Sequence, residues 1–174
     1  RRYPSGTEDF NPIYNEVGLL APEVVDTFPH DTTAYTQGLL FHEGKLYESA
    51  GEAGSGTLRE VDLATGDVLR TVDLPSEVAA GGLAVLDGQI VQLSGPDSMA
   101  LLYDPDTFDP AGELAVSGWG ICSDGTLIDS TQGTPFIDMR DVQTNELIFS
   151  GLITVQGSLV DKLSELECVG DYIY

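Results

Sequence analysis

The chain has 174 residues, and its 7 lysine and arginine residues against 29 aspartate and glutamate residues give a formal net charge of −22. Seven basic side chains are too few to replace the counterions of a phosphate backbone, and we therefore expect no nucleic-acid partner. The acidic residues are expected to form a solvated surface, or else an acidic patch that docks a basic partner. Hydrophobic residues make up 41% of the sequence, enough for one domain with a core, and no apolar run approaches the ~20 residues of a membrane span.

The chain opens with a segment that has no hydrophobic period. Residues 1–22, beginning "RRYPSGTEDFNPIYNEVG", are rich in turn-forming residues, so we predict an extended N-terminal arm before a single unit over residues 23–174. The sequence does not start with Met and has no signal peptide, which makes Arg1 either a processing site or the edge of a longer chain.

Hairpins of two kinds alternate through the rest of the chain. "GLLFHEGKLY", "GLAVLDGQIV", "GICSDGTLI" and "LECVGDYIY" each place a glycine turn between two apolar strands, which predicts inner hairpins. "VDLATG", "YDPDTF" and "RDVQTN" each carry an aspartate three residues before a threonine, where the carboxylate can cap backbone amides of an outer turn. The pairs are Asp62 and Thr65, Asp104 and Thr107, and Asp141 and Thr144. Helical periodicity is confined to "GSLVDKLSELE", which we expect to be a loop.

An inner and an outer hairpin together make a four-stranded sheet of ~40 residues, the length of a propeller blade. The sequence therefore predicts an all-β fold, a β-propeller of four-stranded blades. Three blades are complete, and a fourth begins near Glu165 and stops at Tyr174 in mid-hairpin. Because closed propellers have about 4–8 blades, we expect a longer polypeptide, or a partner chain that completes the ring.

The two cysteines occupy equivalent places in the repeat. Cys122 lies in the third inner hairpin and Cys168 in the fourth. Equivalent positions on packed sheets lie ~10 Å apart, whereas a disulfide needs Cα atoms within ~7 Å. We therefore predict two free, buried thiols.

Several long motifs carry a family resemblance. "FPHDTTAYTQGLLF", "LYESAGEAGSGTLREVDLATGDVL", "QLSGPDSMALLYDPDTF", "GWGICSDG" and "LSELE" occur in an order that closely resembles the glutamine cyclotransferases of plants and bacteria, over residues 23–174. The resemblance implies a five-bladed propeller in an exported or organelle-lumenal protein. It also implies cyclisation of N-terminal glutamine to pyroglutamate with release of ammonia, for which one carboxylate shuttles a proton between the α-amine and the leaving group.

The residues that should form the family's site match only in part. The family's glutamate corresponds to Gly81 in "AAGGL", so the resemblance gives no catalytic residue. Gly95 replaces a tryptophan and Ser164 replaces an asparagine, so that each change removes bulk or an amide. Glu77 is the only nearby carboxylate we identify as a substitute, and four residues along a strand put it ~13 Å away. The positions that agree and complete the list of pocket candidates are Tyr35, Gln37 and Trp119.

Ordinary structural roles compete with these functional ones. Gln37 can bond backbone groups between inner strands, and Trp119 can pack between blades. His30 and Asp31 in "PHD" are expected to stabilise a turn. No His or Cys pair has zinc-ligand spacing, so we expect no metal or cofactor, although scattered oxygens in the propeller channel are compatible with a structural Ca²⁺.

Three functional hypotheses follow. The first is a pseudoenzyme, a cyclotransferase-like propeller that has lost catalysis and acts as a binding or structural module with a protein partner, inside a larger assembly. The second is an active glutaminyl-peptide cyclotransferase, whose partner would be a peptide N-terminus. The third is a widened pocket for another small molecule or peptide terminus.

Overall fold

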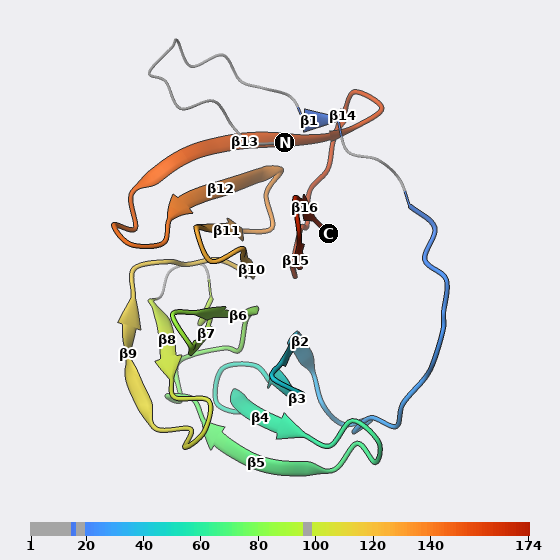
Figure 1. Ribbon diagram of the computed structural model, residues 1–174, viewed down its shortest axis with the longest axis vertical. Helices are drawn as coiled ribbons and strands as arrows, with labels where there is room; N and C mark the ends of the chain where they lie inside the picture. Colours follow the sequence, from blue (N-terminus) through green and yellow to red (C-terminus); the bar gives the residue numbers. More distant parts are fainter. Residues whose placement is uncertain (1–14, 17–19, 96–98) are drawn as a thin grey trace.

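The structure is a computed structural model that describes residues 15–16, 20–95 and 99–174 (Figure 1). Three sheets of antiparallel strands stand around a common centre, and a short fourth hairpin follows them, so the predicted all-β propeller with an incomplete fourth blade is confirmed. Within the described ranges there is no helix, and therefore none that is long and apolar enough to cross a membrane.

Each blade runs from an inner strand outward. The first blade consists of β2 (Thr36–His42), β3 (Lys45–Ala50), β4 (Thr57–Val61) and β5 (Val68–Asp73). The second consists of β6 (Leu83–Leu86), β7 (Gln89–Gln92), β8 (Ala100–Tyr103) and β9 (Pro110–Leu114). The third consists of β10 (Gly120–Ser123), β11 (Leu127–Thr131), β12 (Phe136–Asp141) and β13 (Leu147–Val155), with β14 (Ser158–Leu159) paired to β13. The fourth hairpin is β15 (Cys168–Val169) and β16 (Tyr172–Ile173).

The predicted turns join these strands. In the first two inner hairpins the turn residues are Glu43-Gly44 and Asp87-Gly88, all with positive φ, as a two-residue type I′ turn requires. "GSLVDKLSELE" contributes only β14 and otherwise has no regular structure, so the loop that we predicted there is confirmed.

The outer turns repeat one hydrogen-bond pattern. In each, the aspartate carboxylate accepts the backbone N–H of the residue three positions later, at 2.8, 2.9 and 2.8 Å. The residue that follows this threonine has a left-handed backbone, with φ of 76, 64 and 58°, and it contacts the segment that precedes its own blade or the neighbouring blade. The contacts are Gly66 against the Pro29 carbonyl, Phe108 against the Tyr47 ring, and the Asn145 amide donating to the Ala115 carbonyl.

The core lies between neighbouring blades. Tyr47 and Leu58 of the first blade pack against Leu83 and Ile90 of the second. A second cluster joins the second blade to the third and includes the fully buried Ile128. Because strand side chains alternate between the two faces of a sheet, each central blade contributes one face to each interface.

The predicted arm is only partly described. Residues 1–14 and 17–19 lie outside the described residues, and β1 (Asn15–Glu16) pairs in parallel with β13 beside Ile153 and Thr154. From residue 20 the chain runs without regular structure along the outside to β2 (Figure 1), with Val24 and Val25 exposed.

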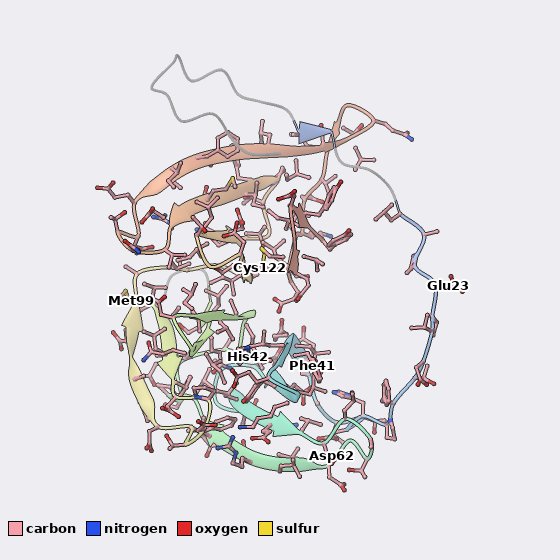
Figure 2. The ribbon with its side chains drawn as sticks, viewed as in Figure 1. Glu23, Phe41, His42, Asp62, Met99 and Cys122 are labelled. Carbon is pink, nitrogen blue, oxygen red and sulfur yellow. A yellow bond between two sulfur atoms is a disulfide. The ribbon has the colours of Figure 1, made fainter. Side chains whose placement is uncertain are left out.

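The prediction of free thiols is wrong, because Cys122 and Cys168 form a disulfide with a Cα–Cα distance of 5.4 Å (Figure 2). Cys122 lies on β10 and Cys168 on β15, the inner strands of successive units. Inner strands converge near the axis, so the ~10 Å spacing of packed sheets does not apply to them.

Replacing a side chain of the interblade core should cost far more than the same change on the surface. For Ile90→Ala, whose side chain is fully buried, we expect the free energy of unfolding to fall by about 2–5 kcal/mol. Ile148→Ala is the matched control, because Ile148 is 54% exposed, and it should cost less than about 1 kcal/mol. Denaturant unfolding of both variants tests this, and equal losses would contradict the described core.

Candidate functional site

Three glycines bring the inner strands together at the axis. Gly38, Gly82 and Gly120 lie in or directly before β2, β6 and β10. A Cβ on Gly38 would lie 3.0 Å from the Gly82 Cα atom, and a Cβ on Gly82 would lie 3.0 Å from the Trp119 carbonyl oxygen. A Cβ on Gly120 would collide with the Ser164 carbonyl oxygen. Each glycine therefore packs against the backbone of the next unit, and we call these three residues with Glu165 the axial ring.

Glu165 is the fourth member of the axial ring, and its carboxyl group lies against Gly38 and Gly82. Its Oε1 atom accepts the Leu83 backbone N–H at 3.3 Å and lies 2.8 Å from where a Gly38 Cβ would be. Its Oε2 atom occupies the space of a Gly82 Cβ, and it is buried with no hydrogen-bond partner within the described residues. Side chains on either glycine would displace this carboxyl group.

The environment of Glu165 favours the protonated acid. Burial raises its pKa to about 8, and the nearby Glu167 carboxylate acts in the same direction. Backbone hydrogen bonds from Leu83, Leu166 and Leu39 lower the pKa but do not outweigh burial. At neutral pH this group can therefore donate a proton, and as its pKa is approached it can also accept one.

Four predicted site residues directly precede the axial ring. Gln37 comes before Gly38, Gly81 before Gly82, Trp119 before Gly120, and Ser164 before Glu165. Because each of them comes one residue before a member of the axial ring, we call these four residues the site layer. Trp119 is 46% exposed and lies over the Gly133 backbone, and its carbonyl accepts the Gly82 N–H at 2.8 Å.

The other predicted residues lie at the margin of this layer. Tyr35 is 60% exposed. Gly95 pairs with Gly118 in an isolated bridge, and a Cβ placed on it would meet no atom of the described residues, which leave out the adjoining 96–98, within 4 Å. As far as the described residues go, the tryptophan position of the family is thus unfilled, and it lies beside Gly118, which precedes Trp119.

A side chain on Gly81 would point into the second blade, at Leu93. A Cβ on Gly81 would lie 2.8 Å from the Leu93 Cβ atom and 2.9 Å from the Leu93 carbonyl oxygen. Leu93 is fully buried, and its N–H donates to the Gly82 carbonyl at 2.9 Å. Position 81 therefore has no room for a glutamate in this backbone.

The interpretation of Glu77 as the nearest substitute carboxylate is wrong. Glu77 is exposed, and a hydrogen bond from the Ser76 hydroxyl lowers its pKa. Glu165 is the carboxyl group beside Gly82, and it stands in the same "SELE" motif from which we singled out only Ser164. A buried acid in a segment without regular structure gave no periodic signal to mark it.

A charged cluster anchors the "PHD" segment to the first blade. Glu48 is 1% exposed and accepts hydrogen bonds from His30 at 2.9 Å and from the Thr36 hydroxyl at 2.5 Å. Arg59 pairs with Asp31 at 3.2 Å, and Asp31 also accepts the Thr33 N–H, as expected for a turn-stabilising aspartate. The cluster fixes the approach to β2, and thereby the position of Gln37.

Comparison with known proteins agrees with the fold. A family model described as glutamine cyclotransferase matches residues 5–174. A glutaminyl-peptide cyclotransferase of Arabidopsis thaliana is 31% identical over 156 residues, which cover 87% of this chain and 49% of the relative. The crystal structure of Myxococcus xanthus glutaminyl cyclase matches with a TM-score of 0.77 and 27% identity, over 87% of this chain and 65% of that one.

A computationally designed protein, Ika4, matches with a TM-score of 0.52 and 16% identity over 88% of this chain and 91% of its own, and shows the fold alone. The chain spans about half the length of the Arabidopsis relative, 49%.

Titration of Glu165 should make the free energy of unfolding depend on pH. Its pKa rises from 4.5 to about 8 on folding, so the folded protein holds this proton more tightly than the unfolded chain. Between these pH values the stability of the wild type should fall relative to Glu165→Gln as pH rises, by up to about 1.4 kcal/mol per unit. Urea unfolding of both proteins at several pH values measures the difference.

Glu77→Gln provides the control. Because the pKa of Glu77 is lowered on folding, this residue stabilises the protein above pH 4.5 and loses that effect only as pH falls below it. The difference in the free energy of unfolding between Glu77→Gln and the wild type should therefore not change between pH 5 and pH 8. Parallel curves for Glu165→Gln and the wild type would contradict the burial of the Glu165 carboxyl group.

Proposed function

Because the chain belongs to the glutamine cyclotransferase family, we propose that its protein keeps the propeller of that family but has lost the catalysis, and that it serves as a binding or structural module in a larger assembly. The packing of Gly81 against Leu93 carries this proposal. In the mechanism that the resemblance implies, a carboxylate at this position moves the proton, and such general acid–base help is typically worth ~10²–10⁴ in rate. A backbone with no room for a Cβ has closed over that position.

The end of the axis where the site layer lies suits the terminus of a peptide. Trp119 and Tyr35 offer exposed aromatic faces, which attract an ammonium group, and Gln37 and Ser164 offer polar groups for an amide. We infer that the ligand is a peptide N-terminus. The exported or lumenal location that the resemblance implies is consistent with a disulfide-bonded chain.

A second candidate is an active glutaminyl-peptide cyclotransferase that uses Glu165. One observation favours it: the Glu165 pKa of about 8 matches the ~8 of a peptide α-amine, so a proton passes between the two groups at little cost. The ionised form of Glu165 would take one proton from the α-ammonium group, and the amine would form a bond to the side-chain amide carbon. The bond between that carbon and the amide nitrogen would break as the carboxyl group returns the proton to the leaving ammonia, and solvent would take the second proton that the attacking nitrogen loses on becoming the lactam N–H.

One experiment on the full-length protein separates the two candidates. A peptide that begins with glutamine is followed for binding by calorimetry and for ammonia loss by mass spectrometry. We expect binding without turnover above the uncatalysed background, and binding about tenfold weaker in Trp119→Ala, because a cation–aromatic contact is worth ~1 kcal/mol or more. A peptide that begins with alanine is the control for the amide.

Turnover in the wild type that disappears in Glu165→Gln would establish the second candidate and overturn the first. Turnover that survives in Glu165→Gln would contradict both assignments. Failure to bind either peptide would leave the structural role and exclude the peptide terminus as the ligand.

A glutamate introduced at position 81 should destabilise the protein and should not produce cyclotransferase turnover. Gly81→Glu must displace the buried Leu93, so we expect the free energy of unfolding to fall by about 1–3 kcal/mol or more, without gain of turnover. Thr71→Glu adds the same charge at an exposed position of β5 and should be nearly neutral. A stable, active Gly81→Glu protein would refute the closure of this position.

A further inference from the structure

Three potential metal ligands meet where the third blade joins the fourth hairpin. Cys122 on β10 stands directly opposite Asp129 on β11, and Cys168 on β15 reaches them from the next unit. One ligand atom of each residue lies within 4.8 Å of the other two. Cys122 and Asp129 are each only 4% exposed, so the group is shielded from solvent on the blade side.

Asp129 has no evident structural partner for its charge. Its Oδ1 atom is buried without a hydrogen-bond partner among the described residues, and its Oδ2 atom lies 3.8 Å from the Cys168 sulfur. Ile137 and Leu166 lie in the same apolar cluster as both cysteines. The charged group that acts on Asp129 is the Asp124 carboxylate, which has the same sign and therefore does not pair with it. A carboxyl group buried in such a place is costly unless something pairs with it, and a disulfide has no hydrogen-bond donor to offer it.

We propose that reduction of the disulfide converts this group into a site for a soft divalent cation of the Zn²⁺ class, with Cys122, Cys168 and Asp129 as its ligands. A dithiol supplies the two electrons: the Cys122–Cys168 bond breaks, two thiols form, and the reductant closes to its own disulfide. The cation then displaces the thiol protons and binds two thiolates and one carboxylate.

The ligand set selects the cation. Two thiolates favour Zn²⁺ and its congeners over Ca²⁺ or Mg²⁺, which bind sets of oxygen ligands. Zn²⁺ accepts Cys sulfur at about 2.3 Å and Asp oxygen at about 2.0–2.2 Å in a tetrahedron, so three protein ligands leave one position for water. The sulfur atoms must move apart, and rotation of the two side chains can supply that movement while the strands stay in place.

The consequence is that the cross-link between β10 and β15 has two chemical forms. Under oxidising conditions a covalent bond ties β15 to β10, and under reducing conditions a metal ion ties the same two strands through the same residues. The inference does not depend on what the propeller binds at its axis.

Cobalt titration of the full-length protein tests the site. The protein is reduced with a dithiol, freed of it without air, and titrated with Co²⁺, whose thiolate complexes absorb by charge transfer. We expect one Co²⁺ per chain beyond that bound by Cys122→Ser, displacement by Zn²⁺, and no such absorption from the oxidised protein.

Asp129→Asn isolates the carboxylate, because it keeps both thiols and nearly the same shape. Loss of this ligand should weaken Co²⁺ binding at least about tenfold, because changes to residues that only support a metal ligand already cost about 10–100-fold in metal affinity. Circular dichroism of each reduced variant verifies the fold. The proposal is overturned if reduced wild type binds no more Co²⁺ than Cys122→Ser, or if Asp129→Asn binds as tightly as the wild type.

Discussion

The blades can approach their axis only because backbone packs there against backbone. Gly38, Gly82 and Gly120 each lie so close to the next unit that a single added carbon atom would push the blades apart. This constraint sets the positions of the residues on either side of the axial ring. It gathers the site layer at one end, and it brings β10 and β15 near enough for a disulfide between them.

The same constraint accounts for the buried acid at the centre. The space that glycine leaves at positions 38 and 82 is filled by the carboxyl group of Glu165, which accepts a backbone N–H from the second blade. Because that group is largely hidden from water, the bound proton neutralises a charge for which the described part of the chain offers no counterion. The buried carboxyl group of Glu165 is thus a consequence of the close packing of the inner strands at the axis.

Local patterns were sufficient to predict the blades, whereas distances across the axis were not predictable. The Asp62 and Glu43 turns follow from residue types within a few positions, and the structure contains both as expected. The disulfide of Cys122 and the carboxyl group of Glu165 depend on the convergence of inner strands from separate units. Repeat alignment gives equivalence between positions, but it carries no information on how far apart equivalent positions lie near an axis.

The outer turns limit how such a propeller can evolve by duplication. All three turns share one backbone, yet the left-handed residue in each is matched to a different neighbour: Gly66 to a carbonyl, Phe108 to an aromatic ring and Asn145 to a carbonyl acceptor. A copy of the second blade inserted in place of the first would bring a phenyl ring against the Pro29 backbone, where not even a methyl group fits. The blades therefore share one architecture but are not interchangeable, because the left-handed residue of each outer turn fits only its own neighbour.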